Sequence, residues 1–368
     1  MRIAFLWPRL AGYMNACLKA LASQPGVELF VCNQRAGAED PFERSQFAWM
    51  DNRYEFQDEP EVGELSRRLA AFQPELVLGG VWNIAAYRHV CRNLGGRCLR
   101  VCLIDNQWRG TVKQYCGMIS APWYLHRLYD AIFVPGERQF RWARHMGFAE
   151  SQIWFGSLSC DVSAFQSVRD FGRTAGNRVF LFVGRMVAEK GIQTLASGYR
   201  KYVCEASKPW PLCIAGVGPL ADYFRYIPNV IQRGFVQPEQ LPELFKGASC
   251  LVLPSVFEPW GIVIHEAVCS GLPVICSSEC GASVHLVQDG LNGIILPPCD
   301  VDSLAAAFHR FSGFSWERRL QMAEASGSLA GQFTPARWAR TVLERVSTTA
   351  LTGSLARAAK ATCSREFQ

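Results

Sequence analysis

Short apolar runs alternate with amphipathic stretches along most of this chain. Runs rich in Val, Ile, Leu and Phe are typical of strands buried in parallel sheets, and the stretches between them repeat apolar residues at helical spacing. The predicted strands of the first half are Ile3–Leu6, Glu28–Cys32, Glu75–Leu78, Leu99–Ile104 and Ala131–Val134. Those of the second half are Val179–Val183, Leu212–Ala215, Val230–Ile231, Leu251–Leu253, Val274–Cys276 and Gly293–Leu296. This alternation predicts parallel sheets covered by helices.

The length of the chain predicts two domains. At 368 residues it exceeds what one hydrophobic core usually organises. We expect an α/β protein with two doubly wound, Rossmann-like domains and a cleft between them. The polar segment Ser163–Arg178 is predicted to link the domains. The predicted units are a first domain at 1–165, a second domain at 166–334, a helix at 335–346 that packs back towards the first domain, and a tail at 347–368.

Composition narrows the class of protein. Hydrophobic residues make up 49% of the chain and charged residues 19%, as in globular proteins. The net charge of +6 is scattered, and no basic, aromatic-rich module predicts a nucleic-acid partner. The 15 cysteines form no C-x-x-C pair, which favours reduced thiols, no structural metal and a cytoplasmic location. The N-terminal segment does not resemble a signal peptide, and no apolar run reaches the ~18 residues of a membrane span.

Glycine and basic residues follow one strand of the second half. Gly184 and Arg185 come directly after Val179–Val183, and Lys190 follows shortly. A tight turn with cations at the carboxyl end of a strand is suited to neutralise a diphosphate. The alternative is a solvated loop with two surface cations.

A glycine-rich turn follows the next strand. Gly216–Ala221 has the G-x-G-x-x-A form of a dinucleotide-binding turn. It occupies the second strand–helix turn of its domain rather than the first, and no acidic residue ends the following strand. We therefore favour a structural tight turn over NAD binding.

Two carboxylates bracket the start of a predicted helix at Gly261. Glu258 precedes the helix, and Glu266 lies one turn inside it among apolar residues. Carboxylates would not bind phosphate but would accept hydrogen bonds from sugar or ribose hydroxyls, whereas free amides at Gly261 and Ile262 can face an anion. The alternative for Glu266 is a buried carboxylate paired with an arginine or the backbone. His265 is expected to be an ordinary core or surface histidine.

Two segments of the first half are further candidates. After Leu99–Ile104 come Asp105, Asn106, Trp108 and Arg109, which would line the cleft on the acceptor side or form a surface loop with its Trp fixed to the core. The basic and aromatic segment Arg138–His145 would contact an anionic membrane or form a solvated helix face.

Together these residues resemble the retaining glycosyltransferases of the GT-B fold, family 4 (group 1) in particular. The resemblance is specific from about Val179 to Leu304. The matching segments are Gly184-Arg185 with Lys190, Gly216-Val217-Gly218, Gly234-Phe235-Val236, Pro254-Ser255, Glu258 to Glu266, Gly271-Leu272-Pro273-Val274 and Gly290-Leu291-Asn292-Gly293.

The resemblance implies a role for each matching residue. Arg185 and Lys190 would hold the diphosphate of a nucleotide-sugar, Glu266 the ribose, and Glu258 the sugar hydroxyls. Arg185, Lys190 and Glu258 are the implied catalytic residues. The implied donor-binding residues are Gly12, Gly184, Arg185, Lys190, Gly216, Phe235, Val236, Glu258, Gly261, Ile262 and Glu266.

The first domain departs from the family pattern. The loop Pro8–Tyr13 holds one glycine where the family is glycine-rich, and Asp105-Asn106-Gln107 stands where many members carry a histidine; His126 lies too far along to replace it. Asp161 follows Ser157–Cys160, which matches the family's turn only in part.

We therefore expect a hexosyltransferase that uses a UDP- or GDP-sugar and a glycan or lipid-linked acceptor in bacterial surface glycan or glycolipid synthesis, with no cofactor and no metal. It would be cytoplasmic, with peripheral contact at the inner membrane face as a further hypothesis. The alternatives are a catalytically silent sugar-nucleotide-binding or scaffold protein and another GT-B activity, such as an epimerase or a phosphorylase.

Overall fold

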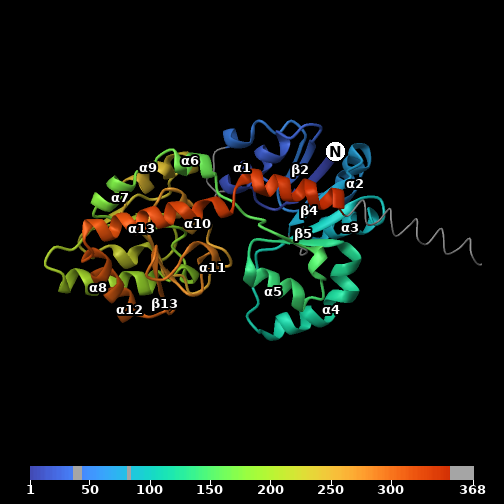
Figure 1. Cartoon of the computed structure of the whole chain (residues 1–368). Helices are drawn as coiled ribbons and strands as arrows, with labels where there is room; N and C mark the ends of the chain where they lie inside the picture. The colour runs from blue at the N-terminus through green and yellow to red at the C-terminus, as the bar shows by residue number, and fades with distance from the viewer. Residues whose placement is uncertain (36–43, 81–83, 349–368) are drawn as a thin grey trace, which may run out of the picture.

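The computed structural model describes residues 1–35, 44–80 and 84–348. They form two parallel sheets, each covered by helices (Figure 1). The first sheet contains β1 (Arg2–Trp7), β2 (Glu28–Gln34), β3 (Arg53–Phe56), β4 (Leu76–Gly80), β5 (Leu99–Leu103), β6 (Ala131–Val134) and β7 (Ile153–Phe155). The second contains β8 (Phe180–Val183), β9 (Leu212–Ala215), β10 (Val230–Gln232), β11 (Cys250–Leu253), β12 (Val274–Ser277) and β13 (Gly293–Leu296). The predicted α/β class with two doubly wound domains is confirmed.

The helices of the two domains differ in length. The first domain has α1 (Gly12–Ala22), α2 (Val62–Phe72), α3 (Ala85–Asn93), α4 (Val112–Leu128) and α5 (Glu137–His145). The second has α6 (Val162–Gln166), α7 (Phe171–Gly176), α8 (Ile192–Glu205), α9 (Leu241–Lys246), α10 (Ile262–Cys269), α11 (Ser283–Leu286), α12 (Val301–Ser312) and α13 (Trp316–Leu329). A final helix occupies residues 335–348. Within the described ranges, no helix combines the length and the apolar composition that crossing a bilayer requires.

The two sheets share one topology. Their strand orders are β3-β2-β1-β4-β5-β6-β7 and β10-β9-β8-β11-β12-β13. In register, Phe5 of β1 lies between Val31 and Leu78, and Leu181 of β8 between Cys213 and Leu251. The order changes direction at β1 and at β8, and ligands of open α/β sheets bind beyond the carboxyl ends of strands at such points.

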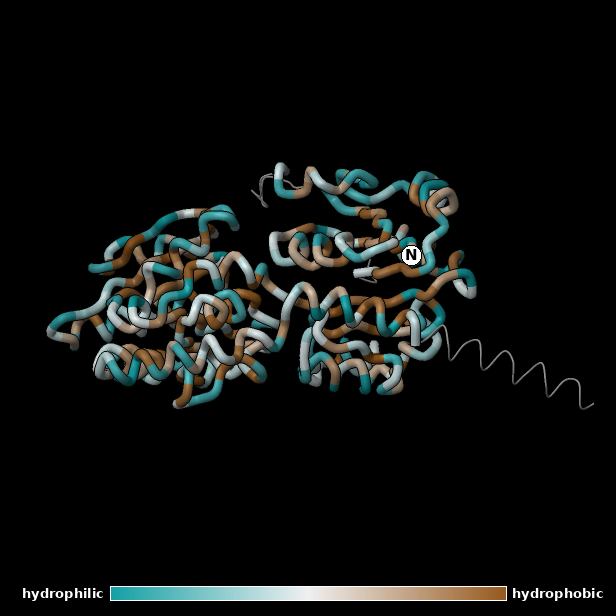
Figure 2. The backbone as a smooth tube through the Cα atoms, turned by 45° about the horizontal axis from the view of Figure 1, so that its top comes forward, coloured by the Kyte–Doolittle hydropathy of each residue, from teal (hydrophilic) through white to brown (hydrophobic). Residues whose placement is uncertain are grey.

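The hydrophobic core explains why the domains hold together. One face of the first sheet packs on its own helices, whereas the other face belongs to one core that it shares with the second domain and that includes Leu158 and Cys160. Hydrophobic positions gather along the strands of both halves, and hydrophilic positions lie in the outer segments (Figure 2).

The chain crosses between domains twice. After β7, the segment predicted as a linker forms α6 and α7, whose first turns are capped by Asp161 and Asp170. Because α6 packs on α10, the first crossing precedes the predicted boundary at 165/166. The final helix then returns across the first domain (Figure 1), where Trp338 Nε1 donates to the Ser157 carbonyl at 2.9 Å. The predicted tail at 347–368 falls outside the described residues from position 349 onwards.

Candidate functional site

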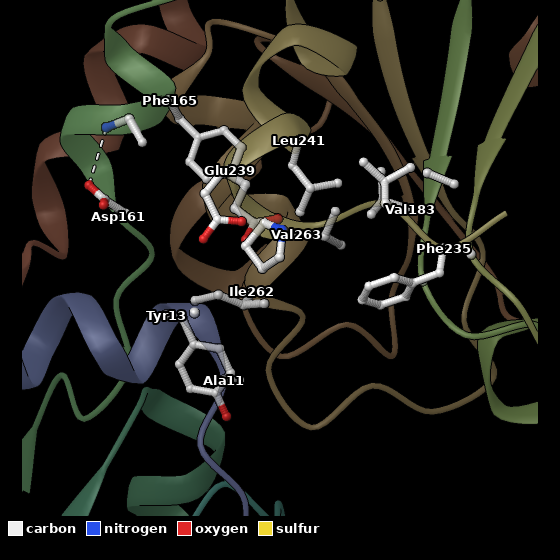
Figure 3. Close-up of a pocket in the computed structure, with 18 of the residues that line it drawn as sticks. Ala11, Tyr13, Asp161, Phe165, Val183, Phe235, Glu239, Leu241, Ile262 and Val263 are labelled. Carbon is white, nitrogen blue, oxygen red and sulfur yellow. Dashed lines mark hydrogen bonds between the residues drawn. The ribbon is translucent and has the colours of Figure 1, made fainter. Parts of the chain in front are cut away.

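A cavity of about 540 Å³ lies between the two domains. Its walls come from the start of α1, from the loops after β8, β9, β10 and β11, and from α10 (Figure 3). Residues that follow the carboxyl ends of β1 and β8, the points where the strand orders change direction, therefore line the same space.

All the residues assigned to the donor side from the sequence line this cavity. They are Gly12, Gly184, Arg185, Lys190, Gly216, Phe235, Val236, Glu258, Gly261, Ile262 and Glu266. The four acceptor-side candidates, Asp105, Asn106, Trp108 and Arg109, are not among the described residues that line it.

Two glycines let the loops after β8 and β9 lie against each other. Gly184 has φ 156° and Gly216 has φ 155°, and a Cβ on Gly216 would lie 1.8 Å from the Gly184 carbonyl oxygen. Gly184 N donates to the Ala215 carbonyl at 3.0 Å, and Gly216 N donates to the Gly234 carbonyl at 2.7 Å. These bonds join three successive loops into one wall. The glycine-rich turn leads into a short 3₁₀ helix, Ala221–Phe224, rather than the longer helix of a dinucleotide-binding turn.

An ion pair joins two loops of this wall. Lys190 ends a 3₁₀ turn after β8 and contacts Glu258, which follows β11. Gly191 permits the approach, because a Cβ there would lie 2.1 Å from the Pro254 carbonyl oxygen. Glu258 is 7% exposed and also lies 3.4 Å from Ser255 Oγ. Lys190 supplies the partner that so buried a carboxylate requires.

The start of α10 supplies free amides and a second carboxylate. Gly261 precedes the helix with φ 88°, and Ile262 is its first residue. Glu266 is half-buried one turn further on, where burial and then the negative charge of Cys269 raise its pKa to about 8. His265 is fully buried on another side of the helix, and its Nδ1 accepts a hydrogen bond from Cys160 N at 3.2 Å. It is a core histidine, as expected.

One side of the cavity is apolar. Phe235, Val183, Leu241 and Val263 lie together there, and Tyr13 and Asp161 lie across the cavity from them (Figure 3). A flat aromatic ligand would find an apolar contact surface on this side.

The first domain contributes residues that sequence analysis missed. Asn15 and Lys19 of α1 and Gln46 of the 3₁₀ helix Arg44–Phe47 line the cavity. Asn15 Nδ2 donates to the Gln46 carbonyl at 3.0 Å and its Oδ1 accepts from Trp49 Nε1 at 2.7 Å. The spacing of Asn15 and Lys19, one turn apart after the first strand, is the signal that would have found them.

The domains approach closely at Gly12. A Cβ on this residue would lie 3.3 Å from Pro238 Cβ in the second domain.

Within the described chain, Gln46 Nε2 is buried and lacks a hydrogen-bond partner. It is therefore a free donor in the cavity wall of the first domain.

The loop after β5 forms an interdomain contact beside the cavity. Arg109 lies over the Phe257 ring at 4.3 Å. Asp105 is exposed, yet protein surrounds its carboxylate closely enough that burial, and secondarily the charge of Glu258, raises its pKa. Trp108 instead stacks on Trp142 and on His145, with ring centroids at 5.1 and 4.7 Å. The structure thus packs Trp108 into the first domain, as in the alternative interpretation.

One cluster in the described chain has the composition of a metal site. Ligand atoms of Cys160, His265 and Cys269 lie within 4.8 Å of one another, and all three residues are buried. Both ring nitrogens of His265 have partners, because Nε2 lies 3.3 Å from the Ala330 carbonyl. A metal ion would have to displace one of these bonds, so the donor set fits a metal poorly.

Comparison with known proteins identifies the second domain. Residues 177–312 match the family model of glycosyl transferases group 1. This part of the chain is similar to a group 1 glycosyltransferase domain. The predicted resemblance is thereby confirmed. The matched residues include those that form the cavity wall after β8, β9, β10 and β11.

Two curated relatives that match this part of the chain are named as a glycosyltransferase and a mannosyltransferase. An uncharacterized glycosyltransferase of Methanocaldococcus jannaschii is 35% identical over 37% of this chain and 36% of its own length. A GDP-mannose-dependent alpha-mannosyltransferase of Corynebacterium glutamicum is 28% identical over 55% of this chain and 46% of its own length. The chain thus spans less than half the length of these curated relatives.

Solved structures extend the likeness to both domains. Anabaena HepE, solved in complex with UDP, has a TM-score of 0.72 at 17% identity and covers 95% of this chain and 100% of its own. An Escherichia coli protein bound with UDP-2-fluoro glucose has a TM-score of 0.73 at 10% identity, over 94% and 99%. The glycosyltransferase domain and the domain before it together have the GT-B fold.

Proposed function

We propose that this chain is a glycosyltransferase that moves a hexose-type sugar from a UDP- or GDP-sugar to an acceptor hydroxyl, with retention of anomeric configuration. One observation carries the proposal: a single interdomain cavity combines the cations Arg185 and Lys190 with the carboxylates Glu258 and Glu266. Cations suit a diphosphate, and carboxylates suit hydroxyls.

In this proposal the donor lies along the second-domain wall. The base contacts the apolar side at Phe235 and Val236, and Glu266 accepts from the ribose hydroxyls. The diphosphate meets Arg185, Lys190 and the amides at the start of α10, where the helix dipole favours an anion. Glu258 accepts from the sugar hydroxyls.

The reaction then needs little covalent chemistry from the protein. The acceptor oxygen attacks the anomeric carbon from the face that the diphosphate leaves, so a new C–O bond forms as the bond to phosphate breaks. The acceptor proton passes to the departing phosphate oxygen. Arg185, Lys190 and the α10 amides stabilise the charge that grows on the leaving group. Closure of the two domains excludes water and limits donor hydrolysis.

Two relatives guide the choice of donors. The Corynebacterium relative is named for GDP-mannose, and HepE was solved with UDP. Both nucleotide classes therefore belong in the test. The acceptor would enter from the first-domain wall, and a glycan or a lipid-linked saccharide is the proposed class.

The test is incubation of the full chain with UDP- and GDP-sugars and a panel of glycan and lipid-linked acceptors. Release of free nucleotide together with a new glycoside of the donor's anomeric configuration supports the proposal. A ligand that raises the melting temperature without turnover across the panel would favour the silent binding protein, which is motivated by the absence of a histidine from 105–107. Conversion of the donor alone would favour an epimerase, and no binding of any nucleotide would reject the nucleotide site.

A further inference from the structure

Helix α4 presents a stripe of large apolar side chains to solvent. Val112 is 80% exposed, Tyr115 49%, Ile119 63% and Trp123 66%. Their spacings of three, four and four residues put all four on one face of the helix, and we call them the α4 stripe. Ala121, Leu125 and Leu128 are buried on the side that packs into the first domain.

The surroundings of the α4 stripe are basic. Between Glu75 and Asp130 the sequence has seven Lys or Arg residues and a single acid, Asp105. Lys113 and Arg127 are exposed on α4 itself, which carries no acidic residue. The neighbouring α3, which contacts α4, adds the exposed Arg92.

The helix first suspected of membrane contact, α5, lies next to α4 and turns its Trp inwards, whereas its exposed face is polar and basic. Trp142 of α5 is 4% exposed and packs close to Gly117 of α4. Arg138 is used in hydrogen bonds to Gln107 and to the Ser278 carbonyl of the second domain. Of the two helices, which lie together at one end of the first domain (Figure 1), α4 exposes the apolar side chains.

We propose that the α4 stripe docks this protein on a bilayer that contains anionic lipids. Amphipathic helices that lie in the membrane interface combine Trp and aliphatic residues on one face with cations beside them. Trp123 and Tyr115 have the apolar ring and polar edge that favour the headgroup level. Lys113 and Arg127 are placed to meet lipid phosphates, since cations near an anionic surface strengthen binding. The cations on and beside α4 match the charge of an anionic bilayer.

The position of α4 connects this surface with the cleft. The loop after β5 leads directly into α4, and Arg109 of that loop lies over Phe257 of the second domain. The start of the helix is therefore beside the mouth of the interdomain cleft. If the proposed function holds, docking brings the cleft to the surface from which a lipid-linked acceptor would enter.

The experiment is co-sedimentation of the full chain with vesicles of phosphatidylcholine alone and with phosphatidylglycerol added. We expect binding to the anionic vesicles that weakens as salt rises. Ile119→Ser/Trp123→Ser should weaken it about tenfold or more, because two apolar side chains no longer enter the interface. Lys113→Gln/Arg127→Gln should remove much of the salt dependence. Tyr226→Ser is the matched control, because Tyr226 is 86% exposed on the second domain.

Each other outcome would overturn the proposal. If the wild-type chain does not bind vesicles, the proposal is wrong. It is also wrong if the Ile119→Ser/Trp123→Ser variant binds vesicles as tightly as the wild type and has the same melting temperature. Sedimentation as a dimer that this variant dissociates, without vesicle binding, would assign the stripe to a second copy of the chain. Vesicle binding needs no nucleotide, so its failure is separate from failure of the donor-binding and turnover assays.

Discussion

Lys190 and Glu258 form a part-buried ion pair on the cavity wall, although they follow two different strands, β8 and β11. Each residue therefore has a structural role besides its proposed role toward the donor. Glu258 is 7% exposed, and a carboxylate at such a position is costly without a cation. A diphosphate would compete with Glu258 for Lys190, so donor binding and the ion pair are coupled.

A variant pair separates these two roles. Lys190→Met should weaken nucleoside-diphosphate binding about 10- to 100-fold, since a charge-assisted contact is lost. It should also lower the free energy of unfolding by about 1–2 kcal/mol, because Glu258 stays buried without its partner. Lys190→Met/Glu258→Gln should recover the stability but not the binding. Calorimetric titration and denaturant unfolding measure the two effects.

Lys201 provides the control for this experiment. It pairs with Asp302 at 2.7 Å, but its side chain is 44% exposed. Lys201→Met should change stability by less than about 0.5 kcal/mol and leave nucleotide binding unchanged. Unchanged nucleotide affinity in Lys190→Met would contradict the diphosphate role.

The raised pKa of Glu266 leads us to expect that nucleotide binding depends on pH. Burial raises its pKa to about 8, so the carboxyl is largely protonated at pH 7. Ribose hydroxyls that donate to the ionised carboxylate would favour deprotonation, and affinity for a nucleoside diphosphate should therefore rise between pH 7 and 9. Glu266→Gln should abolish this rise. A dideoxyribose analogue, which lacks both hydroxyls, should show a flat profile with the wild-type chain.

The raised pKa of Glu266 also determines the direction in which the stability of the chain changes with pH. A raised pKa in the folded state contributes stability at pH values below the ordinary carboxyl pKa of 4.5, and this contribution is lost as pH rises towards 8. The unfolding free energy of the wild type should therefore decline relative to that of Glu266→Gln over this range. A parallel pH profile of the two proteins would show that Glu266 titrates normally.

Gly216→Ala tests the contact between the loops after β8 and β9. The added Cβ would meet the Gly184 carbonyl oxygen at 1.8 Å, and φ at 155° disfavours any side chain. We expect a loss of about 3 kcal/mol in unfolding free energy and of nucleotide binding, because the backbone must shift. Gly176→Ala is the control, since a Cβ there meets nothing within 4 Å. Equal melting temperatures of the two variants would refute this account.

Trp338→Ala tests the return of the final helix to the first domain. The indole is 1% exposed, stacks on Phe133 and donates to the Ser157 carbonyl. Its removal should cost about 3–5 kcal/mol, as for a large core aromatic. Trp316→Ala, at a residue that is 45% exposed, should cost less than 1 kcal/mol. Thermal unfolding compares them, and a similar loss in both would show that Trp338 does not join the domains.

Buried strands were easier to predict from the sequence than exposed elements. The central strands β1 and β8 are nearly continuous apolar runs, because parallel strands are covered on both faces. The edge strands β3 and β7 were missed, since they have only four and three residues, too few to show a clear pattern. Helix α4 shows little of the usual helical periodicity in its sequence, because Gly117 and Pro122 interrupt it and its exposed apolar residues obscure the pattern.

The sequence by itself determined the class of fold and the chemistry of the second-domain wall. Cations, glycines and carboxylates there follow successive strands, and parallel strands bring their carboxyl ends to one edge. Only the tertiary structure decided what meets them across the cleft: Asn15, Lys19 and Gln46, contributed by segments far away in the sequence. It also turned Trp108 into the core and Trp123 out to solvent. These outcomes depend on how helices pack and how the domains dock, which local patterns do not specify.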